Sequence, residues 1–65
     1  MSLKFDMEQI VNGPNDQTNF GSWLLKLIFK ADICNLTKLR SAFPNAVQVV
    51  ETYRKTGEIL DLPDD

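Results

Sequence analysis

One apolar segment, FGSWLLKLIFKA at residues 20–31, constrains the fold of this chain more than any other feature. Its apolar residues recur at spacings of three, four and seven, which is typical of a helix that turns one stripe toward a core. The residues of that stripe are Phe20, Trp23, Leu24, Leu27, Ile28 and Ala31. Leu25 and Phe29 lie outside it, so apolar side chains cover roughly two-thirds of the helix circumference. We therefore expect this helix to be central in the fold or to pack against another molecule.

The rest of the chain lacks the usual supports of a very small domain. At 65 residues it has room for one hydrophobic core, and a core of this size supplies only about 3–5 kcal/mol of net stability. Cys34 is the only cysteine and histidine is absent, so neither an internal disulfide nor an ordinary zinc site can form. Self-association is the support that remains. We expect a single domain over residues 1–65 that forms a homodimer or binds another protein.

The composition also predicts where the protein resides. A lone cysteine beside an apolar run is typical of a reducing compartment, and we expect Cys34 to be a small buried side chain. The N-terminus lacks the apolar core of a signal peptide, and no apolar stretch approaches the roughly 20 residues that span a bilayer. These features predict a cytoplasmic protein that does not bind a membrane.

Residues 1–14 are predicted to form a short helix and a turn. Asp6, with Gln9 three residues later, resembles a capping box. The helix ends at Asn12-Gly13-Pro14, because glycine supplies a left-handed cap and proline cannot continue the hydrogen bonding. The alternative is a strand that pairs with the other end of the chain. Its alternating apolar residues would be Leu3, Phe5 and Met7, opposite Leu60 and Leu62.

Three main helices are predicted after this turn, over residues 17–31, 35–43 and 45–56. The first begins at a polar N-cap, for which Asp16 and Thr18 are the candidates. Pro44 disfavours helical geometry at Phe43, so the second helix stops there and the third begins at once. Gly57 ends the third helix.

The predicted fold is all-α, a small bundle of three main helices with a short N-terminal helix. Residues 15–57 form the three-helix core and residues 58–65 an acidic tail. The second and third helices are expected to cross steeply, in an orthogonal arrangement similar to a helix-turn-helix. The predicted core residues are Phe20, Trp23, Leu24, Leu27, Leu36, Leu39, Phe43, Val50 and Tyr53.

The residue types that most catalysis requires are missing. Histidine, the usual proton-transfer residue near neutral pH, is absent. Cys34 has only Asp32 nearby as a base, and the paired acids Asp64 and Asp65 lie in the tail. The spacing of the residues fits no phosphate-binding, dinucleotide, EF-hand or zinc motif. We expect a protein without enzymatic activity, cofactor or metal.

The wide apolar arc favours protein interaction as the function. In this interpretation Leu25 and Phe29, with Lys26 between them, form a surface that packs against an identical chain or a different partner. In the competing interpretation, the N-terminal helix and residues 59–62 cover Leu25 and Phe29 within one molecule. We expect a non-enzymatic, self-associating interaction module.

A second class of function follows from the order of the last two helices. Their lengths and their short connection at Pro44 are typical of a helix-turn-helix, whose second helix enters a DNA groove. The candidate phosphate contacts are Lys38, Arg40, Arg54 and Lys55, and the candidate base contacts are Gln48, Glu51 and Thr52. Residues 26–55 hold six bases and two acids, a net charge of +4, although the whole chain carries −2. A nucleic-acid-binding regulator is therefore the alternative function.

Residues 24–55 read LLKLIFKADICNLTKLRSAFPNAVQVVETYRK. They contain an apolar helix, a Lys-Ala-Asp turn, a Lys-Leu-Arg segment, a Phe-Pro step and an amphipathic helix that ends in Tyr-Arg. In these elements, over about half of the chain, the sequence resembles small uncharacterised helical proteins of bacteriophages and mobile elements. The resemblance implies an all-α fold and a bacterial or phage accessory protein, with no assigned activity.

Overall fold

The computed structural model describes residues 3–13 and 19–63 and places four helices in them. The helices are α1 (Leu3–Asn12), α2 (Phe20–Lys30), α3 (Ile33–Ala42) and α4 (Pro44–Thr56). The described residues contain no strand, so the all-α prediction is confirmed. The strand alternative is wrong, because Leu3, Phe5 and Met7 belong to α1. Within the described ranges, every helix is too short or too polar to cross a lipid bilayer.

Two side-chain caps begin α2 and α3. The side chain of Asn19 accepts a hydrogen bond from a backbone N–H three residues later, at 3.0 Å. Asp32 does the same at the start of α3, at 2.8 Å. Such oxygens satisfy backbone donors that a helix leaves unpaired in its first turn. The predicted N-caps of the first main helix, Asp16 and Thr18, lie outside the described residues.

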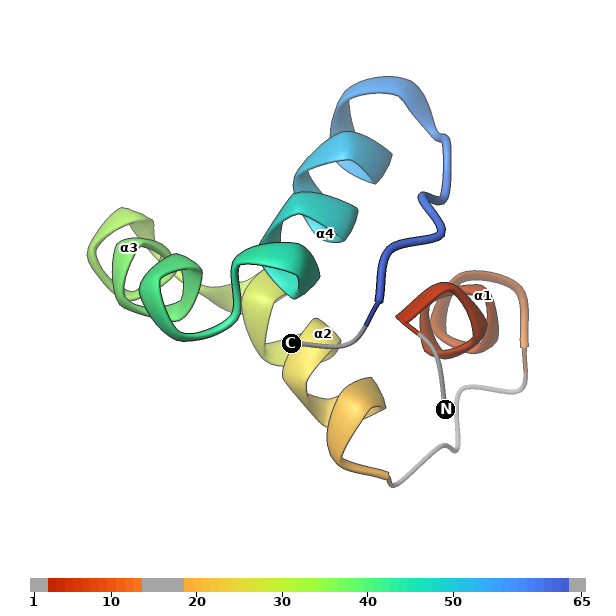
Figure 1. Ribbon diagram of the computed structural model, residues 1–65, viewed down its shortest axis with the longest axis horizontal. Coiled ribbons are helices and arrows are strands. Elements are labelled where there is room, and N and C mark those ends of the chain that lie inside the picture. Colours follow the sequence, from red (N-terminus) through yellow and green to blue (C-terminus); the bar gives the residue numbers. More distant parts are fainter. Residues whose placement is uncertain (1–2, 14–18, 64–65) are drawn as a thin grey trace.

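Proline and glycine set the limits of α4. Phe43 alone separates α3 from α4, and Pro44 occupies the first helical position, where its missing N–H costs nothing. Gly57 ends α4 with a φ of +79°, a left-handed conformation that glycine adopts readily. In Figure 1, α3 is viewed nearly along its axis while α4 lies across the view, so the chain turns sharply at Phe43.

The core lies between α1, α2 and α4. Its buried apolar residues are Leu3, Met7, Leu24, Leu25, Ile28, Ala46, Val47, Val49 and Val50. Helix α1 therefore forms part of the core, which corrects the prediction that the three later helices form it alone. Every residue of α3 is at least partly exposed, and this helix packs on α4 at the side of the molecule (Figure 1).

The face that helix α2 turns to the core differs in part from the one predicted. Phe20, Trp23 and Leu27 are 71%, 58% and 54% exposed, although the sequence predicts them in the core. Leu24 and Ile28 of the predicted stripe are buried, and so is Leu25, which the sequence places outside that stripe. Because apolar residues cover so much of the circumference, periodicity alone does not decide which face is buried. The neighbouring elements decide it, since α1 and α4 together cover the side that carries Leu25 and Ile28.

The other predicted core residues and the C-terminal segment are covered at least in part. Leu24 and Val50 are buried, and the half-buried residues packed against the core are Leu36, Leu39, Phe43 and Tyr53. Residues 58–63 run back from the end of α4 past α1 (Figure 1), and their apolar side chains pack against the core. The Nδ2 group of Asn45 donates a hydrogen bond to the carbonyl of Pro63 at 3.1 Å. The predicted acidic tail is thus an extended segment held on the core as far as Pro63.

Candidate protein-interaction surface

Exposed large apolar side chains are concentrated on one side of α2. Phe20, Trp23 and Leu27 are spaced by three and four residues, so they follow a single face of the helix. We call these three residues the α2 outer face. Clusters of exposed apolar side chains are typical of surfaces where proteins meet. This face is therefore the candidate site of the protein.

Lysines border the α2 outer face. The ammonium of Lys26 lies 5.4 Å from the centroid of the Trp23 ring, within the range of a cation–π interaction. Lys30 is exposed one turn further along, on the same edge of the helix. The sequence of α2 contains no acidic residue. The face is thus apolar in its centre and positively charged along one edge.

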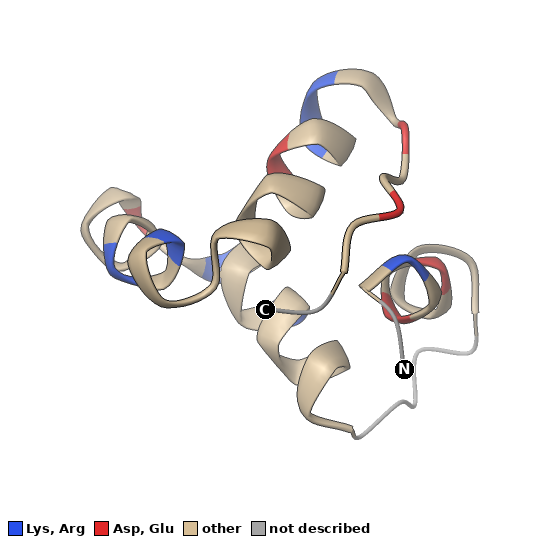
Figure 2. Ribbon diagram, viewed as in Figure 1, with Lys and Arg blue, Asp and Glu red and all other residues tan. Residues whose placement is uncertain are grey.

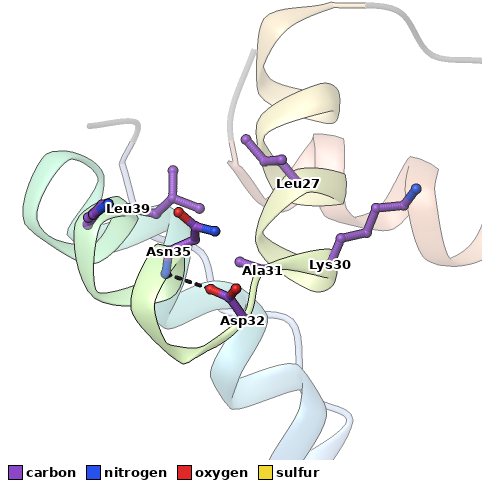
Figure 3. Close-up of a pocket in the computed structure, with 7 residues that line it drawn as sticks. Leu27, Lys30, Ala31, Asp32, Asn35 and Leu39 are labelled. Atoms are coloured by element: carbon purple, nitrogen blue, oxygen red, sulfur yellow. Dashed lines mark hydrogen bonds between the residues drawn. The ribbon is translucent and has the colours of Figure 1, made fainter.

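A groove separates the α2 outer face from α3. It has a volume of about 440 Å³ and is lined by Leu27, Lys30, Ala31, Asp32, Asn35, Lys38 and Leu39. Figure 3 shows Leu27 pointing from α2 toward α3, where Asn35 and Leu39 extend from the facing helix. Lys30 extends outward from the rim, away from α3 (Figure 3). An apolar floor with a few polar groups at the rim suits an amphipathic ligand.

Helices α2 and α3 are linked at both ends, by a contact between two rings at one end and by the chain itself at the other. At one end the Phe20 and Phe43 rings lie 5.9 Å apart, with an angle of 55° between their planes. At the other end the chain passes from α2 to α3 through Ala31 and Asp32. The Asp32 carboxylate is occupied there by its capping hydrogen bond. Ile33, which follows directly, is 80% exposed.

The structure places the predicted interaction residues on two sides of α2. Leu25 is fully buried, and Phe29 is half-buried and packs edge-to-face on Tyr53, with ring centroids 6.4 Å apart. Lys26 is half-buried beside Trp23. Leu25 is therefore covered within one molecule, and Phe29 is covered in part, with Tyr53 of α4 against its ring. The exposed apolar surface is the α2 outer face instead.

A signal for this orientation is present in the sequence. Gly21 and Ser22, the smallest side chains of α2, lie on the same side as Leu25 and Ile28. A Cβ atom added at Gly21 would lie 2.2 Å from Oδ2 of Asp6 in α1. Small residues let a neighbouring element approach closely, so they mark the core side of this helix. Phe20 and Trp23 are much larger, but they lie on the exposed side of the helix.

A second and more open groove lies beyond the lysine edge. It has a volume of about 480 Å³ and is lined by Ile10, Val11, Lys26, Phe29, Lys30 and Tyr53. The Arg54 guanidinium lies 5.1 Å from the Phe29 ring centroid and donates a hydrogen bond to the Phe29 carbonyl. Lys26 and Lys30 therefore separate two apolar grooves, one on either side of the same edge.

Two of the candidate nucleic-acid contacts are engaged inside the protein. Arg40 of α3 forms an ion pair with Glu51 of α4, and Arg54 bonds to the Phe29 carbonyl. Figure 2 shows that Lys and Arg are spread over α2, α3 and the end of α4, with Asp and Glu between them. The described surface therefore offers no continuous basic stripe of the kind that follows a phosphate backbone.

The remaining candidate nucleic-acid contacts are scattered as well. Between residues 46 and 50, in the part of α4 that would enter a DNA groove, only Gln48 is exposed. Thr52 is half-buried, Lys55 is exposed at the end of α4, and Lys38 lines the groove beside α2. This geometry favours the protein-interaction interpretation over nucleic-acid binding.

The structure brings no reactive cluster together in the part of the chain that it describes. Cys34 is exposed in the first turn of α3, which corrects the prediction of a buried cysteine. Helix α3 has α4 as its main neighbour, so much of its surface, Cys34 included, stays exposed. Among the described residues, no three side chains of the metal-binding types lie close enough to hold an ion.

The described residues form a small all-α fold in which α2 exposes an apolar face. No protein-family model, curated protein or solved structure matches the chain.

Proposed function

We propose that this chain is a non-enzymatic protein-interaction module that docks on its partner through the α2 outer face. The observation that carries the proposal is the asymmetry of α2. This helix buries Leu25 and Ile28 completely. It leaves the α2 outer face, which is Phe20, Trp23 and Leu27, more than half exposed. Burying a tryptophan and a phenylalanine at an interface is among the strongest single contributions to binding.

The size of the apolar surface supports this proposal. The α2 outer face exposes apolar area on the order of 400 Å², because its three large side chains present roughly 150–250 Å² each and are more than half exposed. A specific interface buries about 800 Å² on each partner. The α2 outer face supplies an apolar centre of fitting size, and the lysine stems and the walls of the groove supply the rim.

The weak packing of α3 supports a partner at this site. Every residue of α3 is at least partly exposed, and the helix has α4 as its main neighbour. In proteins most helix stability comes from tertiary packing rather than from the intrinsic preference of the residues. A partner that covers the groove between α2 and α3 would supply such packing, whether it is a second copy, as the sequence predicts, or another protein.

The setting we propose is that of a small bacterial or phage accessory protein in the cytoplasm. The exposed thiol of Cys34 supports a reducing compartment, because an exposed thiol oxidises readily outside one. The bacterial or phage origin is proposed from the resemblance of the elements in residues 24–55 to small helical phage proteins.

Photocrosslinking from the α2 outer face tests the proposal. A photoreactive benzoylphenylalanine replaces Leu27 in the full chain, and the variant is irradiated in its native host cell. The matched control carries the same group at Gln48, which is exposed on α4. A discrete adduct from position 27 that is missing from position 48 supports a docking face. Equal adduct patterns, or the lack of any adduct at position 27, would contradict it.

A further inference from the structure

The groove between α2 and α3 has the form of a receptor for a helix. Its floor consists of Leu27, Ala31 and Leu39, and the neighbouring α2 outer face continues the apolar surface along the helix. The eleven residues of α2 give a wall about 16 Å long at 1.5 Å per residue. A partner helix of about three turns fits that length, in the mode where an amphipathic helix lies in an apolar groove.

The charges around this groove are mostly positive. Lys30 and Lys38 lie on opposite walls, and Lys26 continues the edge of α2. Asp32 is the acidic residue of the lining, and its carboxylate already accepts the capping hydrogen bond of α3. The other described acids lie on α1, α4 and the C-terminal segment (Figure 2). A ligand with negative charges on both sides of its apolar stripe complements this rim.

A second copy of the chain complements the same rim poorly. In an antiparallel two-fold pairing of α2 helices, each edge of one helix faces the same edge of its copy. The pairing would therefore bring Lys26 and Lys30 against the partner copy's identical lysine edge, and like charges so placed are destabilising. Helix α1 carries Asp6 and Glu8, but it already uses Leu3 and Met7 in its own core.

We infer that the groove binds an amphipathic helix of a different protein, about three turns long, with Asp and Glu residues flanking its apolar stripe. This inference rests on the proposed function and names the chemistry of the partner. The apolar stripe covers Leu27 and Leu39, and the flanking acids pair with Lys30 and Lys38. Trp23 lies at the edge of the bound helix and loses contact with water.

Binding of designed peptides tests the inference. The probes are an acidic helical peptide with a leucine stripe flanked by glutamates, the same peptide with lysines in place of the glutamates, and a scrambled acidic peptide without the stripe. Trp23 is the only tryptophan, so its fluorescence reports contact at the site when the probes lack tryptophan. We expect the acidic peptide to shift the emission to shorter wavelength and to bind at least about tenfold more tightly than the lysine peptide. Equal binding of these two peptides, or of the scrambled one, would overturn the inference.

Charge reversal supplies the matched variants. The double variant Lys30→Glu/Lys38→Glu is expected to exchange the preference, so that the lysine peptide binds better. Lys55→Glu, which changes an exposed lysine at the end of α4, is expected to leave both affinities unchanged. Helical circular dichroism confirms that each variant is folded. An unchanged preference in the double variant would also overturn the inference.

The outcomes separate this inference from the proposed function. If the adduct formed from position 27 in the host cell has twice the mass of the chain, the docking face stands and the foreign acidic helix is wrong. If position 27 gives no adduct and no peptide binds, both proposals fail. If the adduct contains another protein and the acidic peptide competes for its formation, both are supported.

Discussion

The hydroxyl group of Ser22 is fully buried against the core side of α2. Its Oγ atom has no hydrogen-bond partner among the described residues, although its backbone N–H is held by the side chain of Asn19. A buried polar group without a partner costs about 1–3 kcal/mol. We expect Ser22→Ala to keep the backbone cap and to raise the free energy of unfolding by about 1 kcal/mol, measured by urea denaturation. The exposed Ser41→Ala serves as control, and a loss of stability in Ser22→Ala would show that the hydroxyl has a partner.

Gly21 is small because α1 approaches it closely. A Cβ atom at this position would lie 2.2 Å from the buried Asp6 carboxylate. We expect Gly21→Ala to lower the free energy of unfolding by about 1–3 kcal/mol, as overpacking does. In the background of Asp6→Ala the same change is expected to stabilise by up to about 1 kcal/mol, because alanine is the better helix former. A double-mutant cycle in urea measures this reversal, and additive effects would mean that the two residues do not meet.

At the level of helices, the sequence predicts the limits of α4 to within one residue, because single residues decide them. Pro44 and Gly57 act through their own backbone geometry, so their effects do not depend on the rest of the fold. Asp6 shows the limit of such signals. The sequence predicts it near the N-cap of the first helix, but α1 starts at Leu3 and Asp6 is buried inside its first turns against Gly21. An acidic residue favours the whole first turn and not the cap alone.

The face that a helix buries depends on its neighbours and is harder to predict. Around α2, the stripe of Phe20, Trp23 and Leu27 has the same period as the stripe of Leu25 and Ile28. The spacing predicts Phe20, Trp23 and Leu27 in the core, but the structure leaves all three more than half exposed. The packing of α1 and α4 decides which side of α2 is buried, and these helices come from other parts of the chain. Within α2 itself, the small residues Gly21 and Ser22 indicate which side of the helix is covered.

Helix α3 is the element with the least support from its surroundings. Its residues are all at least partly exposed, and α4 is its main neighbour. Local opening is easiest where few apolar contacts must be broken. We expect native-state hydrogen exchange to give α3 a lower opening free energy than α2 or α4. Addition of the acidic peptide should raise the protection of α3 and leave the end of α4 unchanged. Equal protection of all helices in the free protein would contradict this account.

At the level of the whole molecule, the distribution of charge bears on nucleic-acid binding. The chain carries a net charge of −2, and its acids stand between the bases on the surface (Figure 2). Non-specific affinity for DNA comes from the release of counterions by clustered bases. We expect the fluorescence anisotropy of a labelled mixed-sequence duplex to stay unchanged on addition of the protein, even at low salt. Binding that weakens steeply with added salt would contradict this and favour the helix-turn-helix interpretation.

The whole molecule depends on one core, so the orientation of α2 can be tested by stability. Leu25 is fully buried and Leu27 is 54% exposed, two residues apart on the same helix. Removing a buried leucine side chain costs about 2–5 kcal/mol, which is most of the roughly 3–5 kcal/mol that a core of this size supplies. We expect Leu25→Ala to be largely unfolded at room temperature by far-ultraviolet circular dichroism. Leu27→Ala should stay folded, within about 0.5 kcal/mol of the original chain. The opposite result would place the aromatic stripe in the core and the docking surface on the other side of α2.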